Sequence, residues 1–383
     1  MTEPAAEKRV SWAELFFDLV FVYALTEVSA LLGADHSWAG LLRALIVFVP
    51  VYWAWVGVAI LSNQRDTARS GLRLVLFGVA LAALFMALAV PEAYADRGVL
   101  YASAYWAGRL LMASVQARER LRGVRLPLNP HVVSAVVTGP LLLGGGFTHS
   151  DVRVALWGLG ALIELASLTL LRSRLRGMHF DSSHLAERFG AFVLIALGES
   201  VVAIGASAHP LDVPVGFAVA AAFALSCGLW WLYFNYAAAA VRHALATAPV
   251  QVDIARLVLS YGHLSFIAAI ILVAGGLHQA VSHPTHHLSW AFVGLLGGGT
   301  ALYLATFGFT RWAMFRLLSV TRLAAAAVVV ALLPLLVRLP AVLALGVLAL
   351  VVGVLNVVEW MRVERSGFRA VLARRRPAPA EQL

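Results

Sequence analysis

Long apolar runs follow one another along nearly the whole chain, with short polar connections between them. Each run has about 18 to 24 residues, enough for a helix to cross about 30 Å of hydrocarbon. The pattern predicts an all-α polytopic membrane protein with about 12 transmembrane helices. The predicted spans are 14–33, 39–62, 72–91, 98–117, 131–148, 152–171, 187–206, 213–236, 254–278, 290–310, 319–337 and 340–360.

The composition agrees with this pattern and leaves no room for a sizeable soluble domain. Of the 383 residues, 61% are hydrophobic and 13% are charged, and the mean hydropathy is +0.84. The segment from Met1 to Val10 is short and polar, and no small-residue cleavage pattern follows the first apolar run, so we expect no removable signal peptide. The single cysteine, Cys227, excludes an intrachain disulfide or thiolate metal cluster.

The distribution of the positive charge along the chain indicates membrane topology rather than nucleic-acid binding. The net charge is +9, and arginines concentrate at alternate connections between the predicted spans, so we expect no nucleic-acid partner and both termini in the cytoplasm. The predicted inner segments hold Lys8 and Arg9, Arg65 to Arg73, Arg118 to Arg125, Arg172 to Arg176, Arg242 and Arg256, Arg311 to Arg322, and a basic tail. The predicted outer side keeps only Arg43, Arg97, Arg153 and Arg338.

Similar motifs open the first and seventh spans and indicate an internal duplication. Glu14-Leu-Phe16 is followed by Glu27, and Glu187-Arg-Phe189 is followed by Glu199 at nearly the same spacing. Two parallel six-helix repeats, 14–178 and 179–361, are therefore predicted between a cytoplasmic N-terminus at 1–13 and a basic cytoplasmic tail at 362–383. Binding sites in such proteins lie between the repeats.

Ionisable side chains within the predicted spans are the candidate functional residues, because each one needs a partner, a water-filled cavity or a task. The candidates for a transport or ion-pair site are Glu14, Asp18, Glu27, Arg109, Glu164, Glu187, Glu199 and His263. Glu14 and Asp18 share a helix face at the inner end of the first span, whereas Glu27 lies about three turns further out. Glu199 is the first choice, since it is deep within the seventh span.

Structural roles compete with these functional ones. Glu14 and Asp18 fall where carboxylates cap a helix or pair with arginine. Glu187 and Arg188 are expected to form an interfacial pair that His184 shares, while His263 is either a proton relay or a neutral hydrogen-bonded residue. Arg109 is the natural counter-ion, and its expected partner is Glu27, Glu164 or Glu199.

Two other patterns receive structural interpretations. The outer-loop histidines from His278 to His287 lack regular ligand spacing, so no metal site is predicted. The triplets Gly144 to Gly146 and Gly297 to Gly299 lack a following Lys-Ser/Thr, which favours close helix packing over phosphate binding. No cofactor is expected, and enzymatic motifs are absent, so an enzyme is the third choice.

Two long motifs resemble the bacterial low temperature requirement A family. They are Val10-Ser-Trp-Ala-Glu-Leu-Phe-Phe-Asp-Leu-Val-Phe-Val-Tyr-Ala-Leu-Thr and Glu187-Arg-Phe-Gly-Ala-Phe-Val-Leu-Ile-Ala-Leu-Gly-Glu-Ser-Val-Val. The resemblance implies a multi-pass protein of the bacterial cell membrane that is associated with cold growth. The first motif also looks like the first-helix signature of endolysosomal potassium channels, with Phe17 where those proteins have serine and Ala191 where the second aspartate would fall.

Two functions remain open at this stage. The first is a channel or transporter for a small cation or a proton-coupled solute, with Glu199, Glu27, Asp18 and Arg109 lining or gating the path. The second is a non-transporting membrane protein of cold or stress adaptation, structural or lipid-related, in which ion pairs specify helix packing. The lipid bilayer is the expected partner in both, and the sequence is compatible with an oligomer.

Overall fold

The computed structural model describes residues 8–67, 69–121 and 129–366, and within these ranges the protein is helical with no strand. The first seven helices are α1 (Trp12–Ala34), α2 (Trp38–Gln64), α3 (Ser70–Ala89), α4 (Gly98–Leu121), α5 (Pro130–Val133), α6 (Gly139–Gly146) and α7 (Ser150–Leu170). The next five are α8 (Arg172–Leu175), α9 (Ser182–Ser207), α10 (Val213–Leu232), α11 (Ala238–Thr247) and α12 (Gln251–Ile254). The last five are α13 (His263–Ser282), α14 (Trp290–Val293), α15 (Gly299–Phe315), α16 (Val320–Leu336) and α17 (Ala341–Ser366).

Every predicted span coincides with helix in the structure. Within the described ranges, nine helices are long and apolar enough to cross a membrane, and Pro130–Gly146 and Val320–Leu336 are shorter apolar helices. The remaining position is occupied by α4, which carries buried Arg109. The twelve-span count and the repeat boundaries remain predictions. The N-terminal residues 1–7, Arg122, Arg125 and the tail from 367 onward lie outside the described residues.

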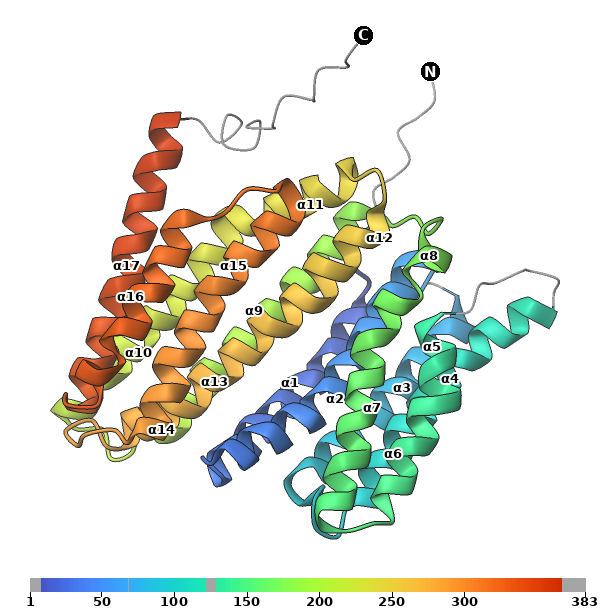
Figure 1. Cartoon of the computed structure of the whole chain (residues 1–383), viewed down its shortest axis with the longest axis horizontal. Coiled ribbons are helices and arrows are strands. Elements are labelled where there is room, and N and C mark those ends of the chain that lie inside the picture. Colours follow the sequence, from blue (N-terminus) through green and yellow to red (C-terminus); the bar gives the residue numbers. More distant parts are fainter. Residues whose placement is uncertain (1–7, 68, 122–128, 367–383) are drawn as a thin grey trace.

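The helices form two groups that lie side by side (Figure 1). In the first group α1 packs on α2 and α3, α3 on α4, α4 on α6, α6 on α7, and α7 on α2. In the second group α9 packs on α10 and α13, α13 on α15, α15 on α16, α16 on α17, and α17 on α10. The groups meet where α1 contacts α9 and α13, and where α2 contacts α9.

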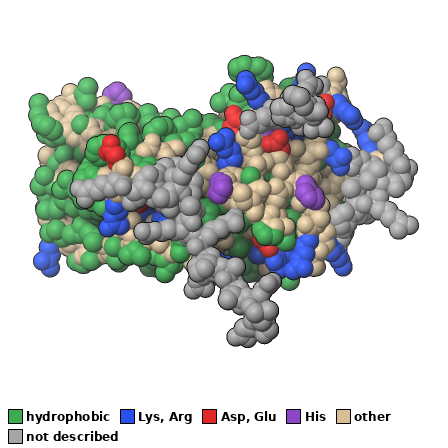
Figure 2. Space-filling model, turned by 90° about the horizontal axis from the view of Figure 1, so that it is seen from above, with side chains coloured by type: hydrophobic (Ala, Val, Ile, Leu, Met, Phe, Trp, Pro, Cys, Tyr) green, Lys and Arg blue, Asp and Glu red, His purple; other side chains and the backbone are tan. Residues whose placement is uncertain are grey.

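Apolar side chains cover the outside of the molecule as well as its core. Large apolar side chains such as Leu74, Leu162, Phe217 and Leu350 are exposed on the outer faces, which is the arrangement that a lipid-facing helix requires. Figure 2 views the end at which α1 and α9 begin, which we call the basic end. Exposed arginines belong to this end by the course of the chain: Arg69 and Arg73 where α3 begins, Arg118 near the end of α4, and Arg174 and Arg176 between α7 and α9.

In the part of the chain that the structure describes, four helices contain a wider π-helical stretch, and none of these was predicted. The stretches are Ser134–Thr138, Tyr233–Ala237, Ala255–Gly262 and Gly294–Gly298. Each one joins two α-helical pieces into a continuous apolar segment. Because π-helical turns are frequently found at functional sites, the elements around them are a natural place to search for one.

The glycine triplets make close helix contacts. A Cβ atom on Gly299 would lie 2.9 Å from the backbone oxygen of Ala269 in α13, whereas one on Gly298 would meet nothing within 4 Å. Gly146 approaches the backbone of Gly98 in α4 in the same way, at 3.0 Å. These distances agree with the packing role expected for the triplets.

Gly299→Ala is therefore expected to destabilise the α13–α15 contact by about 1 to 3 kcal/mol, because backbone atoms would have to move apart. Gly298→Ala is the matched control and should be neutral or stabilising. Thermal unfolding of the purified variants in detergent measures both. Equal unfolding temperatures for the two variants would contradict the close-packing role of Gly299.

Candidate functional site

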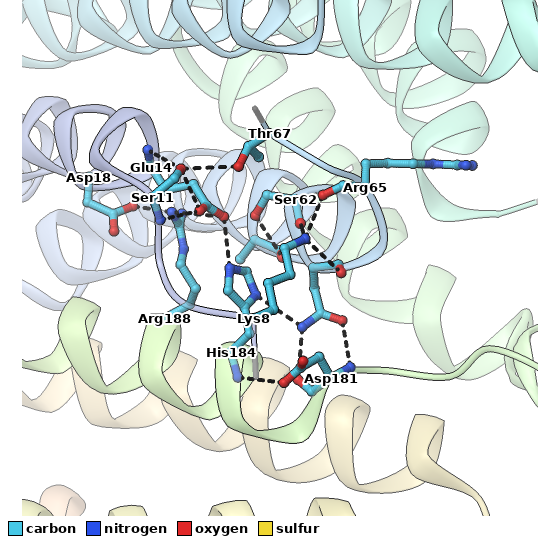
Figure 3. Close-up of polar contacts among 12 residues, drawn as sticks. Lys8, Ser11, Glu14, Asp18, Ser62, Arg65, Thr67, Asp181, His184 and Arg188 are labelled. Atoms are coloured by element: carbon cyan, nitrogen blue, oxygen red, sulfur yellow. Dashed lines mark hydrogen bonds and ion pairs between the residues drawn. The ribbon is translucent and has the colours of Figure 1, made fainter. Parts of the chain in front are cut away.

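A cluster of buried charged side chains lies where the two helix groups meet, near the basic end (Figure 3). Glu14 and Asp18 come from the first turns of α1, and His184 and Arg188 come from the first turns of α9. All four side chains are fully buried. We call these four residues the interface cluster.

Glu14 both caps its own helix and reaches across to α9. Its Oε2 atom accepts hydrogen bonds from the backbone N–H and the hydroxyl of Ser11, each at 2.8 Å, which completes a capping box. Its Oε1 atom lies 3.1 Å from His184 Nε2 and 3.7 Å from Arg188 Nη1. The capping role expected for Glu14 is thus present, and it occupies only one of the two oxygens.

Arg188 is the only arginine in the interface cluster, and it binds Asp18 directly. Arg188 Nη2 donates to Asp18 Oδ1 at 2.9 Å, and Trp55 Nε1 of α2 donates to the same oxygen at 2.8 Å. The guanidinium lies 5.7 Å from the centre of the Trp55 ring, which adds a cation–π contact. Trp55 also stacks on Phe192, one turn beyond Arg188 along α9, with ring centroids 4.1 Å apart.

The hydrogen bonds around His184 determine which ring nitrogen carries the proton. The Asp181 backbone N–H donates to Asn63 Oδ1 at 3.1 Å, and its carbonyl accepts from Asn63 Nδ2 at 2.9 Å, which fixes the orientation of the amide. Asn63 Nδ2 then donates to His184 Nδ1 at 3.1 Å. The imidazole proton is therefore assigned to Nε2, facing Glu14.

The interface cluster has more acidic than basic groups. Two carboxylates face one guanidinium, and the hydrogen bonds assign His184 to its neutral form, so these four residues carry one negative charge when both carboxylates are ionised. The Lys8 ammonium, which also interacts with Glu14, lies outside these four residues. Asp18 Oδ2 and Arg188 Nε are buried and have no hydrogen-bond partner within the described structure. One additional proton would neutralise the cluster, and uptake of a proton is what this charge count favours.

Lys8 lies beside the interface cluster, near His184 and the end of α2 (Figure 3). Its ammonium donates to the carbonyl oxygens of Ser62, of Asn63 at 3.1 Å and of Arg65 at 2.5 Å, where α2 ends. A cation there satisfies terminal carbonyls and complements the helix dipole. Burial nevertheless lowers the pKa of the Lys8 ammonium from its usual value, against the opposing effects of Glu14, Asp66 and Asp181.

Arg109 and Glu164 form a second buried pair, inside the first helix group. Arg109 Nη2 of α4 lies 3.6 Å from Glu164 Oε2 of α7, and the two side chains are 2% and 0% exposed. Tyr105 donates to Glu164 Oε1, and Ser134 donates to Oε2 at 2.9 Å. Of the three partners expected for Arg109, the structure therefore places Glu164 beside it.

The other acidic candidates lie apart from both clusters. Glu199 Oε2 accepts a hydrogen bond from Thr26 of α1 at 2.5 Å, further along the α1–α9 contact, and half-buried Glu27 lies nearby. Glu187 is exposed. The expected Glu187–Arg188 pair does not match the geometry, because Arg188 points into the interface cluster and pairs with Asp18 and Glu14.

His263 is buried between two π-helical stretches. Its Nδ1 atom lies 2.9 Å from the Val258 carbonyl, and its Nε2 atom lies 2.6 Å from the Tyr233 hydroxyl. Nδ1–H therefore donates to the carbonyl oxygen, while the Tyr233 hydroxyl can accept from Nε2–H or donate to a deprotonated Nε2. This geometry matches the hydrogen-bonded alternative for His263.

Sequence reasoning named His184 and Arg188 but placed them with Glu187 rather than with Glu14 and Asp18. His184 and Arg188 are four residues apart on α9, as Glu14 and Asp18 are on α1, so complementary pairs open two helices with similar motifs. That spacing was the available signal for the correct pairing. The sequence did not predict that Trp55 donates to Asp18 within the cluster. Within the described ranges, no group of three His, Cys, Asp or Glu side chains is placed to hold a metal ion.

Long apolar helices, apolar outer faces and ion pairs buried between helices define a helical membrane protein in contact with the lipid bilayer. The chain belongs to the family described as bacterial low temperature requirement A protein (LtrA), which it matches over residues 9–357. An uncharacterized protein, RA0937, of Rhizobium meliloti (strain 1021) is 28% identical over 315 residues, covering 79% of this chain and 77% of that protein. No solved structure matches the chain significantly.

Proposed function

We propose that this protein is a channel or transporter for a small cation or a proton-coupled solute, and that the interface cluster is its protonation site. The observation that carries the proposal is the excess of acidic over basic groups in the fully buried cluster between the helix groups. A buried carboxylate that gains or loses a proton changes its attraction to Arg188, and hence the contact between α1 and α9.

The proposed topology has twelve spans in two parallel repeats of a multi-pass protein of the bacterial inner membrane. The neighbour order of the six helices in one group recurs in the other, which supports the repeat. The arginines at the basic end support a cytoplasmic position for that end and for both termini. In this topology Glu199 and Glu27 lie on the outer side of the same α1–α9 contact that holds Glu14 and Asp18.

A non-transporting function is the second candidate, and the complete burial of the interface cluster favours it. In that case the ion pairs serve only to select the packing of α1 against α9, as buried polar groups do in some proteins. The protein would then act in cold or stress adaptation through a structural or lipid-related role of the assembled helices, without transport. The two candidates differ in whether neutralising Asp18 changes flux.

Asp18→Asn is expected to remove most proton-coupled flux while the protein still folds. Asparagine keeps an oxygen that accepts from Trp55 and Arg188 but cannot exchange a proton at neutral pH. Flux in vesicles with a trapped pH-sensitive dye should fall about a hundredfold, the lower end of what a positioned proton-transfer group contributes. Glu199→Gln tests the outer carboxylate in the same assay.

Glu187→Gln is the matched control, since Glu187 is exposed beside Arg188 and should leave flux unchanged. Wild-type flux no greater than that of protein-free vesicles, for protons, sodium and potassium alike, would leave the non-transporting candidate as the better one. Unchanged flux in Asp18→Asn would remove the interface cluster from the transport path.

A further inference from the structure

We propose that a cavity between the two helix groups binds a small organic monoanion, such as a carboxylate with an apolar part of ring size. The cavity has a volume of about 150 Å³ and lies between α2, α4, α5 and the π-helical stretch Ala255–Gly262. We call it the cationic cavity. Its charged and polar lining residues are Gln64, Arg65, Arg109, Gln116, Asn129, His131, Ser134, Arg256 and Ser260.

The charge of the cationic cavity selects an anion. Three arginines, Arg65, Arg109 and Arg256, line it, and the described lining contains no carboxylate. Glu164 lies beside Arg109, and Asp253 lies beside Arg256, but neither carboxylate is among the described lining residues. Asp253 is also bound by Arg172 through both of its oxygens. An anion in the cavity would therefore meet guanidinium groups and no carboxylate of the described lining.

Arg109 supplies the unsatisfied donors that point to a ligand. Its side chain is 2% exposed, and Nε and Nη2 have no hydrogen-bond partner within the described structure. The Glu164 oxygen at 3.6 Å compensates its charge but is too distant to accept a hydrogen bond. Buried guanidinium donors without partners are costly, and a carboxylate presents two oxygens that match their fork.

Gly57 of α2 lies at the cavity wall, close to the Nη1 side of the Arg109 guanidinium. A Cβ atom on Gly57 would lie 2.9 Å from Arg109 Nη1 and 3.0 Å from the His131 ring. A larger side chain at this position would press on the guanidinium and on the cavity. Glycine at this position therefore lets α2 pack closely against Arg109 where the arginine lines the cavity.

The size and the apolar walls restrict the rest of the ligand. Trp53, Val56, Ile60, Leu168 and Val252 line the cavity beside the polar groups. An apolar cavity of about 150 Å³ is known to hold benzene, so a single ring or a short chain fits. An inorganic anion would leave these walls unfilled. The geometry therefore favours one carboxylate on a small apolar group.

This inference deepens the proposed function by naming the class of solute that proton coupling would serve. The cavity and the interface cluster flank the same end of α2, where Asn63 contacts the cluster and Arg65 lines the cavity. Binding is measured at equilibrium on purified protein in detergent, whereas flux is measured in vesicles. Failure of one measurement is thus distinguishable from failure of the other.

Radiolabelled benzoate is the probe, and equilibrium dialysis at neutral pH measures its binding. We expect saturable binding of one benzoate per chain, with benzamide and inorganic phosphate each displacing it at least about tenfold less effectively, the effect of losing one charge-assisted contact. No saturable benzoate binding would overturn the proposal. If benzamide displaced the probe as readily as unlabelled benzoate does, the requirement for a negative charge would be overturned. If phosphate did so, the requirement for an apolar part would be overturned.

Two variants test the assigned place. Gly57→Leu fills the space without changing charge, and the Arg109→Gln, Glu164→Gln double variant removes the guanidinium without leaving Glu164 unpaired. Each should weaken benzoate binding about tenfold or more while its thermal unfolding shows a folded protein. Gly71→Leu, at an uncrowded glycine of α3, is the control and should bind as wild type. Wild-type affinity in either of the first two variants would contradict the assigned site.

Discussion

Replacing Arg188 by glutamine is expected to destabilise the protein by about 3 to 5 kcal/mol, the usual effect of removing one partner from a buried charge pair. Glu14 and Asp18 would then lie in the closed interface between α1 and α9 without a guanidinium. The free energy of unfolding, obtained by titrating mixed detergent micelles with SDS, measures the loss.

Because the interface cluster holds two carboxylates and one guanidinium, we expect Arg188→Gln and Asp18→Asn to change the unfolding free energy by different amounts. Asp18→Asn leaves one carboxylate and one guanidinium and keeps the acceptor of Trp55, so it should change the unfolding free energy by only about 1 kcal/mol. Combining the two substitutions should recover part of the Arg188→Gln loss. Glu187→Gln, next in sequence but exposed, should stay within about 0.5 kcal/mol of wild type. Equal losses for Arg188→Gln and Asp18→Asn would refute the excess of acid in the cluster.

Glu164→Gln is the second substitution with a large expected effect, again about 3 to 5 kcal/mol. Arg109 would keep its charge at 2% exposure with no carboxylate beside it, and one of the donors Tyr105 and Ser134 would face an amide N–H₂ group. Loss of folded protein in size-exclusion chromatography and a lowered unfolding temperature would both report this.

The double variant Arg109→Gln, Glu164→Gln separates charge from packing in this pair. It restores neutrality, so most of the loss should be recovered. Glu92→Gln, which breaks an exposed ion pair with Arg97, is the control and should leave the stability of the protein nearly unchanged. If the double variant is no more stable than Glu164→Gln, the loss comes from the disrupted hydrogen bonds of Tyr105 and Ser134 rather than from the uncompensated charge.

Hydropathy was sufficient to locate the helices, because a membrane-spanning segment must satisfy its own backbone hydrogen bonds and be apolar over its whole length. Each predicted span therefore lies on helix, including the short helix Pro130–Gly146. The π-helical stretches were not predicted, since they change the backbone hydrogen bonds from the i→i+4 to the i→i+5 pattern without changing which residues are apolar. Tyr233–Ala237 and Ala255–Gly262 have no sequence feature that separates them from ordinary helix.

For the interface cluster, the sequence predicted the arrangement of the two side chains of α1 but not which side chains of α9 lie opposite them. The spacing of Glu14 and Asp18 indicated a shared face at one end of a span, and the structure places both on that face. Glu199, the first choice from depth alone, contacts Thr26 instead of a basic residue. Depth along one helix does not determine which side chain of a distant helix lies opposite, so the identity of each counter-ion remained open.

The sequence by itself determined the membrane-spanning character, the positions of the helices, the family and the ionisable residues that need an explanation. These follow from local rules, since hydropathy, helix period and motif spacing act within one segment. Only the tertiary structure decided that Arg188 binds Asp18, that Arg109 lies beside Glu164 and that Gly57 and Arg109 line one cavity. The physical reason is that each contact joins helices separated along the chain, and their relative rotation is set by the packing of the whole interface.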